Sequence, residues 1–484
     1  MKLLKYVGGL LLILMAVIVV RTFMHTPPPM ADVTPVNIEI DADSAAKHLS
    51  ESITYRTVSN QSKADKNDAA FLGFIRWVKD TYPAVNNELE LVMLNQTMLY
   101  KWQGSDERLK PILVTGHYDV VPVIPGSEDK WEHPPYEGKI VDGIVWGRGA
   151  LDDKSGVVGI LEATTFLIAD GFKPARTIYL SFGHDEEVGG PEGAGAVTAY
   201  LKENNVQLAW SLDEGSFLFK GMFPGVDNLI AAINVAEKGS VTLDIVATAA
   251  GGHSSMPPKN NAVGVLAKAI NKLEENPVPG GLQGLSAIMF DRISRYFDFP
   301  MRMLFANRWL FDGVIDSQLS NVTFANAMLR TTTAPTMLSG SVKTNVLPIE
   351  AIATVNFRVH PRDTPESVQA YVESIVADEQ ISVRTLGGRG ASDVSSWEAD
   401  GFDLIGRSLR EVYGDVAVTP GLMIAGSDSR HYGQVADDAY RFNPFELTQE
   451  NLSGFHGTNE RMGVDNFVMG IKAYVQIMRH GAGA

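Results

Sequence analysis

The segment SFGHDEEVGG, residues 181–190, decides how the rest of the chain is interpreted. A β-prone run at residues 177–182 leads into two adjacent carboxylates, Glu186 and Glu187, and a pair of glycines follows them. Adjacent glutamates more often belong to a solvated helix face, so this pair needs support from other segments. Other apolar runs that also end in His, Asp or Glu provide that support.

The composition limits the classes of function. A chain of 484 residues is too long for one compact domain, so we expect two or three units with separate cores. The formal charge is −16, and no basic stripe with interleaved aromatic residues is present, which argues against a nucleic-acid partner. The absence of cysteine excludes disulfides, cysteine-ligated zinc and thiol nucleophiles. Any metal ion must therefore be held by His, Asp and Glu.

The N-terminus has the pattern of an export or membrane-anchor signal. Lys2 and Lys5 precede an apolar run at residues 6–20, and Arg21 and a proline-rich spacer at residues 27–29 follow it. Positive charge is heavier before the run, which predicts a cytoplasmic N-terminus and a body outside the cytoplasm. The run is shorter than a span of about 20 residues, but no small-x-small cleavage site follows. We therefore favour an uncleaved anchor over a cleaved signal peptide, which would give a secreted protein.

Strands and helices alternate through the first half of the chain. Short apolar runs at residues 111–116, 177–182 and 206–212 predict buried strands, and residues 153–169 predict a helix with one apolar side. This alternation predicts an α/β sheet domain with helices on both faces. A helix at residues 465–479 is expected to close the domain.

A different pattern begins near Lys238 and predicts a second domain inserted into the first. Its order, β-α-β-β-α-β, is that of a ferredoxin-like α+β lid. The expected strands and helices cover residues 240–249, 261–275, 339–343, 351–360, 365–377 and 381–386. The chain then divides into an anchor or signal with its spacer (1–30), a catalytic domain in two parts (31–237 and 388–484) and the lid (238–387).

A long segment at residues 277–334 exceeds what such a lid needs. Its middle reads AIMFDRISRYFDFPMRMLFANRWLF and is rich in Phe, Met and Arg. We expect this segment to pack on the lid or at a subunit interface. The alternative is an apolar funnel or a membrane-contacting flap for apolar substrates.

Four pairs of chemically competent side chains stand at or after the ends of predicted strands. The pairs are His117 and Asp119, Asp152 and Asp153, Glu186 and Glu187, and Asp213 and Glu214. Open α/β sheets form their functional crevice outside the carboxyl ends of strands, so these side chains should converge. Such a set without cysteine suits Zn(II) or another divalent ion, and more than four groups suffice for two ions.

The spacing within these pairs predicts separate tasks. Residues two apart in an extended strand face the same way, so Asp119 would lie beside His117 and orient its ring. Adjacent Glu186 and Glu187 point apart, which fits one metal ligand and one proton-transfer group.

Two histidines in loops are further candidates. His253 lies in GGHSS, residues 251–255, where small residues suggest a close approach to another group. His456 lies in a loop before the last helix. Taken alone, either could be an ordinary surface residue.

A series of motifs along the chain resembles a known family. They are HYDVVPV (117–123), GRGALDDKSG (147–156), HDEEVGG (184–190), LDEGS (212–216), GGHSSMPP (251–258), TNVLP (344–348), NFRV (356–359), AGSDSRHY (425–432) and FHGTNERM (455–462). Together they are similar to the dizinc aminoacylase and carboxypeptidase family, which includes glutamate carboxypeptidase, aminoacylase and the succinyl-diaminopimelate desuccinylase. The resemblance is greatest to the branch of carboxypeptidase S (Gly-X carboxypeptidase) and secreted N-acyl-amino-acid hydrolases.

The resemblance implies two Zn(II) ions per subunit, with Co or Mn as alternatives. Asp152 would bridge the two ions. The other ligands would be His117 and Asp213 on one ion and Glu187 and His456 on the other, with Glu214 as the alternative to Asp213.

The resemblance also implies roles in the reaction. Glu186 would be the general base that passes a proton from water to the leaving amine, and Asp119 would orient His117. His253 would reach the site of a neighbouring subunit and stabilise the oxyanion, which implies a homodimer formed through the lid.

Three further residues would bind the substrate. Asn345 and Arg358 match positions that hold the substrate carbonyl and its free carboxylate, and Arg430 is another candidate for the carboxylate. The implied reaction is cleavage of an amide bond next to a free carboxylate, either in a short Gly-X peptide or in an N-fatty-acyl amino acid, which could also be synthesised. The remote alternative is a non-catalytic binding protein.

Overall fold

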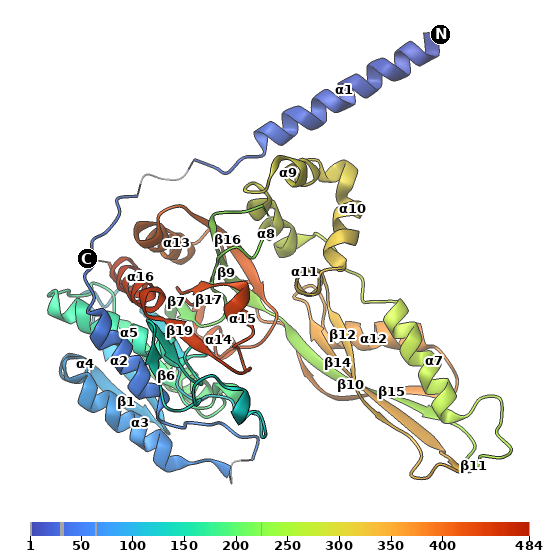
Figure 1. Cartoon of the computed structure of the whole chain (residues 1–484), viewed down its shortest axis with the longest axis horizontal. Helices are drawn as coiled ribbons and strands as arrows, with labels where there is room; N and C mark the ends of the chain where they lie inside the picture. The colour runs from blue at the N-terminus through green and yellow to red at the C-terminus, as the bar shows by residue number, and fades with distance from the viewer. Residues whose placement is uncertain (1, 30–32, 63–64, 224, 484) are drawn as a thin grey trace.

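The computed structural model describes residues 2–29, 33–62, 65–223 and 225–483. Figure 1 shows a sheet domain packed with helices, a lid that extends away from it and a long N-terminal helix. The predicted fold class, an α/β sheet domain with an inserted α+β domain, is confirmed by the strand order of the two main sheets. The expected start of the catalytic domain at residue 31 lies outside the described residues.

The sheet domain is built on a ten-stranded mixed sheet. Its central strands β6 (Ile178–Gly183), β3 (Ile112–His117) and β7 (Leu208–Asp213) run parallel, so their carboxyl ends meet at one edge. Buried apolar side chains from these strands, such as Leu113 and Val114, contribute to the cores on its two faces. The other strands are β1 (Glu90–Leu94), β2 (Thr97–Trp102), β8 (Leu218–Phe219), β9 (Leu229–Glu237), β16 (Val416–Met423), β17 (Ala436–Arg441) and β18 (Glu446–Leu447).

Helices cover both faces of this sheet (Figure 1). Helix α13 (Asp400–Tyr413) illustrates why they pack there: Phe402, Ile405 and Leu409 fall on one helical face and are buried. One face carries α2 (Ala42–Ile53), α5 (Lys154–Ala169), α13 and α16 (Val464–Ala482), with α3 (Asp68–Thr81) and α4 (Pro83–Glu88) beside them. The other face carries α6 (Ala194–Glu203) and α14 (Ser429–Tyr432).

The lid has its own sheet and its own core. Strands β10 (Gly239–Thr248), β12 (Thr332–Ser339), β14 (Glu350–Val359) and β15 (Ile381–Arg389) pair in the order β12-β14-β10-β15. Helices α7 (Ala262–Glu275) and α12 (Pro365–Val376) contribute apolar side chains to the core on this sheet. A short pair of strands, β11 (Gly252–His253) and β13 (Val346–Leu347), lies at the far end of the lid (Figure 1).

One predicted strand of the lid was misplaced. The strand expected at residues 339–343 is β12, which ends at Ser339, and turns follow it. Strand β12 is the edge of its sheet, and most of its side chains are exposed, so it lacks the alternating apolar pattern that reveals a strand. Its position at the edge also explains why Pro335 is tolerated within it.

The segment at residues 277–334 forms four helices beside the sheet domain. They are α8 (Gly284–Ser294), α9 (Phe299–Ala306), α10 (Arg308–Ser320) and α11 (Thr323–Leu329). Helix α8 packs on β16, and Met289 and Phe290 belong to the core of the sheet domain. The segment touches the base of the lid, where Ser286 lies 3.3 Å from His360. The prediction was that this segment packs on the lid or at a subunit interface. Its first part is corrected, because most of the buried apolar side chains serve the sheet domain.

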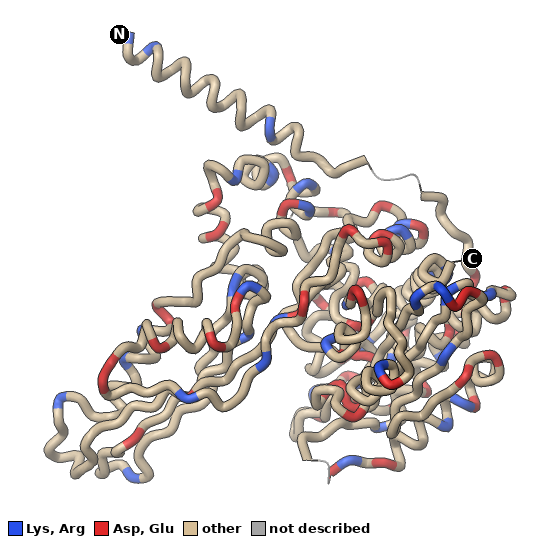
Figure 2. The backbone as a smooth tube through the Cα atoms, turned by 180° about the vertical axis from the view of Figure 1, so that it is seen from behind, with Lys and Arg blue, Asp and Glu red and all other residues tan. Residues whose placement is uncertain are grey.

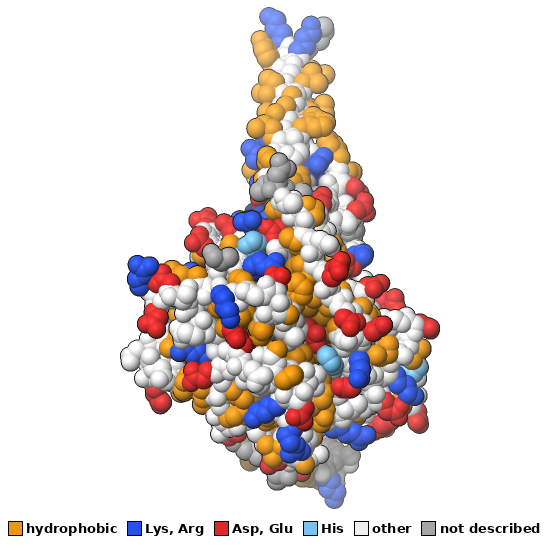
Figure 3. All heavy atoms as spheres, turned by 90° about the vertical axis from the view of Figure 1, so that its left-hand side faces the viewer, with side chains coloured by type: hydrophobic (Ala, Val, Ile, Leu, Met, Phe, Trp, Pro, Cys, Tyr) orange, Lys and Arg blue, Asp and Glu red, His pale blue; other side chains and the backbone are white. Residues whose placement is uncertain are grey.

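Helix α1 (Lys2–Met24) is, among the described residues, the one helix long and apolar enough to cross a membrane. Its sequence contains Lys2, Lys5 and Arg21 but no acidic residue, as Figure 2 also shows. Figure 3 shows it projecting from the body with apolar side chains on its surface.

Candidate metal centre

The candidate ligands come from separate segments that the sheet brings to one edge. His117 ends β3, Asp213 ends β7, and Glu187 lies in the short turn η3 (Glu186–Val188) after β6. Asp152 precedes α5. His456 lies between α15 (Gln449–Leu452) and β19 (Arg461–Gly463).

A small sheet explains why the loops that carry Asp152 and His456 lie side by side. Strand β19 pairs with β5 (Ile144–Trp146), which in turn pairs with β4 (Ile140–Val141). This pairing joins the glycine-rich loop before Asp152 to the segment after His456. Segments about 300 positions apart in sequence thus build one site.

Asp152 lies between two histidines. Its Oδ1 is 3.0 Å from His117 Nε2, and its Oδ2 is 3.1 Å from His456 Nε2. Glu187 Oε2 lies 3.4 Å from His456 Nε2. Potential ligand atoms of His117, Asp152 and Glu187 all lie within 4.8 Å of one another. Asp152 thus presents one carboxylate oxygen to each of the two imidazoles.

Two buried carboxylate oxygens beside this cluster lack hydrogen-bond partners among the described residues. They are Glu187 Oε1 and Asp213 Oδ2. The other oxygen of Asp213, Oδ1, accepts a hydrogen bond from the backbone N–H of Glu214 at 2.9 Å. Buried polar atoms are normally paired, so these oxygens fit ligands of a cation. The donor set of imidazole and carboxylate suits zinc.

The electrostatics of the cluster also favour a cation. Hydrogen bonds to Asp152 and Glu187 raise the pKa of His456 to about 10. Burial raises the pKa of Asp213 to about 6. Burial, with the nearby carboxylates of Asp152 and Glu186, also raises the pKa of Glu214 well above its usual range. A concentration of acids that oppose one another's ionisation is stabilised by a bound positive ion.

Asp119 connects the cluster to the segment that carries both glutamates. Its carboxylate accepts hydrogen bonds from Ser59 Oγ (2.6 Å) and from the backbone N–H groups of Glu186 and Glu187 (3.2 Å each). It also lies 3.4 Å from His117 Nδ1, while its backbone carbonyl is closer, at 3.0 Å. The carbonyl and the carboxylate of Asp119 therefore both orient the ring of His117.

Glu186 lies beside the metal cluster and is partly exposed. Burial raises the pKa of Glu186 well above its usual range. The charge of His117 lowers this pKa, and the charges of Asp428 and Glu187 raise it further. A carboxyl with a raised pKa at the edge of a metal site is suited to proton transfer.

Glu460 is a residue whose role the sequence did not reveal. Its buried carboxylate accepts hydrogen bonds from the backbone N–H groups of Gly149 (3.0 Å), Leu151 (2.8 Å) and Asp152 (3.1 Å), and from Arg148 (2.5 Å). It thereby fixes the loop that carries Asp152. The only sequence signal was its place in the motif FHGTNERM.

The structure does not bring the lid candidates to the metal cluster. His253, in β11, and Asn345, directly before β13, are both exposed, and β11 lies at the far end of the lid (Figure 1). The carbonyl of Asn345 accepts a hydrogen bond from the backbone N–H of Ser254 at 3.1 Å. Arg358 is exposed on β14. Arg430 is closer to the site, because its guanidinium donates a hydrogen bond to the carbonyl of Gly189.

This site defines a metal-dependent hydrolase of the α/β class, and comparisons with known proteins agree. The family model "Peptidase family M20/M25/M40" matches residues 113–480. The chain belongs to this family of metallopeptidases and amidohydrolases, as the sequence motifs predicted, and it is a metal-dependent enzyme of the zinc type.

Two relatives match nearly the whole chain. "Probable carboxypeptidase S-like 2" of Dictyostelium discoideum is 37% identical over 479 residues, which are 97% of this chain and 92% of that protein. "N-fatty-acyl-amino acid synthase/hydrolase PM20D1" of Xenopus tropicalis is 36% identical over 482 residues, 97% of this chain and 93% of that protein.

Solved structures share the fold. An M20 family metallo-carboxypeptidase, Sso-CP2 of Sulfolobus solfataricus, has a TM-score of 0.64 at 17% identity and covers 90% of this chain and 98% of its own. Human carnosine dipeptidase 1 has a TM-score of 0.60 at 16% identity and covers 91% and 96%.

Proposed function

We propose that this protein is a dizinc hydrolase that removes the C-terminal residue from short Gly-X peptides. The observation that carries the proposal is the position of Asp152, which offers one oxygen to His117 and the other to His456. That arrangement supports two ions that share one carboxylate. In the proposed ligand set, His117 and Asp213 would hold one ion, Glu187 and His456 would hold the other, and Asp152 would contribute to both.

Bound zinc would supply Lewis acidity to this site. The chemistry of the chain itself centres on Glu186, which accepts a proton from the attacking water and delivers it to the leaving amine. Its raised pKa supports this role, because the group must bind and release a proton within one turnover. Asp119 acts through His117, whose ring it orients.

Recognition of the free carboxylate is assigned to arginines. Arg358 and Arg430 both lie near Arg389, whose pKa is lowered by burial and then by the charge of Arg430. The guanidinium of Arg389 is held 3.1 Å from Glu237. Guanidinium groups bind carboxylates through paired hydrogen bonds, so Arg358 and Arg430 are the proposed contacts.

A homodimer through the lid would complete the site. His253 and Asn345 lie on neighbouring segments at the exposed end of the lid, where β11 pairs with β13, so they would enter the site of a second subunit together. There His253 would donate to the developing oxyanion, and Asn345 would bind the substrate carbonyl.

The proposed division of the chain follows from this assignment. Residues 31–237 and 388–484 would form the catalytic domain, and residues 238–387 the inserted part, in which helices α8 to α11 pack on the catalytic domain and the remainder forms the lid. Helix α1 would be an uncleaved anchor that holds the catalytic body outside the cytoplasm. A cleaved signal and a secreted enzyme are the alternative.

A second candidate function is hydrolysis or synthesis of N-fatty-acyl amino acids. It is favoured by the 36% identity over 97% of this chain to a protein named for that activity. Both candidates cleave an amide next to a free carboxylate and require the same metal site.

One experiment separates the candidates. Zinc-loaded full-length protein in mild detergent is assayed on a Gly-Leu dipeptide and on a long-chain N-acyl-leucine, with Glu186→Gln as the control. Faster release from Gly-Leu supports the carboxypeptidase, and faster cleavage of acyl-leucine supports the lipid-amide hydrolase. Equal inactivity of wild type and Glu186→Gln on both substrates would reject the proposed function. Metal analysis should give two ions per chain; protein purified without chelator that holds no metal would indicate a binding protein.

A further inference from the structure

The helices α9 to α11 expose an unusual number of apolar side chains for the surface of a soluble domain. Trp309 is 57% exposed and Val314 51% exposed. The others are Phe299, Met301, Leu310 and Phe324. Exposed apolar side chains grouped on helices that contact one another indicate a partner that the isolated chain lacks. We call the exposed side chains of α9 and α10 the apolar platform.

The apolar platform is joined to the last turns of α1. The rings of Phe23 and Phe299 lie 5.5 Å apart. Arg21 Nε donates a hydrogen bond to the carbonyl of Ala306 at 3.1 Å, at the end of α9. Asn307 Nδ2 donates to the carbonyl of Ile18 at 3.2 Å, and Asn307 is fully buried. These polar contacts hold the junction of α9 and α10 level with residues 18–23 of α1.

Helix α1 fixes where a bilayer would lie. Its 23 residues extend about 35 Å, which is enough to cross the hydrocarbon core. The apolar run ends at Arg21, and such a basic residue marks the boundary between hydrocarbon and head groups. Since the junction of α9 and α10 contacts the helix at this level, the apolar platform lies at the same boundary. Trp309 is the kind of side chain that favours it.

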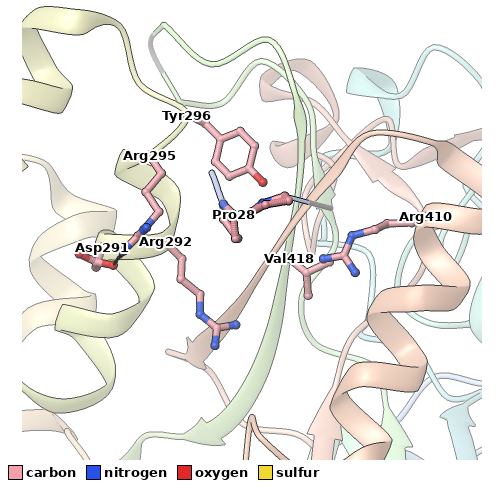
Figure 4. A pocket seen from close by; sticks show the side chains of 8 residues that line it. Pro28, Asp291, Arg292, Arg295, Tyr296, Arg410 and Val418 are labelled. Atoms are coloured by element: carbon pink, nitrogen blue, oxygen red, sulfur yellow. Dashed lines mark hydrogen bonds and ion pairs between the residues drawn. The ribbon is translucent and has the colours of Figure 1, made fainter. Parts of the chain in front are cut away.

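A cationic cavity lies at α8, the helix that precedes the apolar platform. It encloses about 460 Å³ between α8, α13 and the spacer that follows α1, and Arg292, Arg295 and Arg410 contribute to its lining (Figure 4). Pro28 of the spacer forms part of its wall. The spacer is held there because His25 Nε2 is hydrogen-bonded to Ser294 Oγ (2.9 Å) and Arg295 donates to the carbonyl of Thr26 (3.2 Å).

The arginines of this cavity are only partly neutralised. Arg295 forms an ion pair with Asp291 at 2.9 Å. Among the described residues, no carboxylate forms an ion pair with Arg292 or Arg410, and the buried Nε of Arg410 has no hydrogen-bond partner. Asp403 and Glu398 act on Arg292 from further away. In a chain with a formal charge of −16, a cavity lined by three arginines is suited to an anionic group.

We propose that the apolar platform and this arginine cavity form a surface that rests on the bilayer crossed by α1. The apolar platform contacts acyl chains, and the cavity receives the phosphate of an anionic phospholipid head group. The catalytic body is thereby held at a fixed orientation on the membrane. This inference rests on the proposed retention of α1 as an anchor, which the intact mass of the purified protein tests separately from hydrolysis of Gly-Leu.

The absence of cysteine makes a direct test practical. The single-cysteine variant Leu310→Cys is labelled with an environment-sensitive fluorophore. The matched control is Ile124→Cys, labelled in the same way, at a position of the sheet domain that is 61% exposed. The full chain is reconstituted in vesicles that contain an anionic phospholipid. We expect spin-labelled lipid to quench the probe at residue 310 several-fold more than the probe at residue 124, and aqueous iodide to show the opposite order.

Three results would overturn this inference. Equal quenching of both probes by iodide would mean that the apolar platform faces water. Protection of residue 310 from both iodide and spin-labelled lipid would mean that protein, such as a second copy of the chain, covers it. An intact mass that lacks α1 would remove its basis, while activity on Gly-Leu would still stand.

A second measurement tests the cavity. Lipid quenching at residue 310 is followed in vesicles with an increasing fraction of anionic lipid, for the parent, for Arg292→Gln with Arg410→Gln, and for the charge-matched lid variant Lys259→Gln with Lys268→Gln. We expect quenching to rise with anionic lipid in the parent and the lid variant but not in the arginine variant. If quenching in the arginine variant rises with anionic lipid as it does in the parent, the head-group site is rejected. It is also rejected if millimolar inorganic phosphate abolishes the dependence of quenching on anionic lipid, whichever vesicles are used.

Discussion

The hydrogen bonds of Glu460 show how one buried carboxylate can control a metal site that it does not touch. Its Oε1 accepts hydrogen bonds from the backbone N–H groups of Gly149, Leu151 and Asp152, and its Oε2 accepts one from Arg148. Both partners of the Arg148–Glu460 pair are at most 2% exposed. Such outer contacts fix the direction of a ligand and are often nearly as important as the ligand itself.

Replacing Glu460 by Gln should weaken metal binding without removing a ligand. The amide nitrogen would face Arg148, another donor, so we expect a loss of stability of about 3 kcal/mol and a decrease in zinc affinity of about 10- to 100-fold. Thermal unfolding and competition with a zinc-binding dye measure the two effects. The exposed Glu450→Gln serves as control. Unchanged zinc affinity in a folded Glu460→Gln variant would show that Asp152 is positioned by other contacts.

Lys238 gives the stability of the protein a pH dependence. The residue is buried where the lid begins, and its Nζ donates to the carbonyls of Ala327 (3.0 Å) and Arg330 (2.8 Å). Burial, with the nearby charges of Arg358 and Arg362, lowers its pKa to about 7. An unfolded lysine has a pKa of about 10.4. Between these values the unfolded chain binds a proton that the folded chain does not, so raising the pH favours the fold.

Compared with Lys238→Met, the wild-type protein should therefore gain roughly 1 kcal/mol of stability per pH unit between pH 7 and about 9.5. Below pH 7 both states hold the proton, so the two proteins should keep a constant difference. Urea unfolding at several pH values gives this comparison, and the variant subtracts the effect of other titrating groups. Parallel curves across the whole range would mean that Lys238 is solvated in the folded protein.

The sequence was sufficient for side chains whose position follows from a strand end. His117, Glu186, Glu187 and Asp213 lie where their strands predicted, because parallel strands bring their carboxyl ends to one edge. It was insufficient for Glu460, whose partners are backbone N–H groups more than 300 positions away. Every residue except proline carries a backbone N–H group, so the sequence does not indicate which N–H groups will bind Glu460. Only the folded chain reveals these contacts.

Among the elements, the least predictable were those with exposed or shared surfaces. Strand β12 lies at the edge of the lid sheet and shows no apolar alternation. The segment of helices α8 to α11 was expected to pack on the lid or at a subunit interface, because its apolar residues do not reveal which surface they cover, but most of its buried ones belong to the core of the sheet domain. The buried elements β3, β6 and α16 were predicted to within a few residues, because burial imposes a clear hydrophobic period.

Helix α8 should contribute strongly to the stability of the sheet domain. Phe290 is 5% exposed and stacks on Phe305 with ring centroids 6.3 Å apart. Removing a buried phenylalanine side chain costs about 3–5 kcal/mol. We expect Phe290→Ala to lower the stability of the sheet domain by about this amount, whereas Phe324→Ala, at an exposed position of α11, should cost much less.

Tryptophan fluorescence during urea unfolding is a suitable measurement for this pair. The chain has seven tryptophans, and all lie in the sheet domain or in the segment of α8 to α11. The signal therefore reports the sheet domain rather than the lid. Similar midpoints for Phe290→Ala and wild type would mean that α8 is a detachable flap and not part of the core.

At the scale of the whole molecule, the two ends of the lid have different surroundings. Its base joins the sheet domain, and its far end, with β11 and β13, extends away from the metal cluster (Figure 1). The far end exposes Met256, Val342 and Ile349, which are 81%, 100% and 72% exposed. A chain that depends on His253 for its chemistry cannot supply it to its own site in this arrangement. The residue could act only in a second subunit.

Mixing two inactive variants tests this dependence between subunits. Glu186→Ala lacks the proposed base but keeps His253, and His253→Ala has the opposite defect. In a two-fold symmetric dimer, a mixed pair contains one site with Glu186 from one chain and His253 from the other. After exchange of subunits at equal concentrations, half of the dimers are mixed, so activity should recover to about a quarter of the wild-type value.

Recovery should disappear when both substitutions are in the same chain and that chain is mixed with Glu186→Ala, because no chain then supplies Glu186. Full activity of His253→Ala alone would show that the histidine has no catalytic role. If the mixture of the two variants is as inactive as each variant alone, the site does not use the histidine of the neighbouring chain.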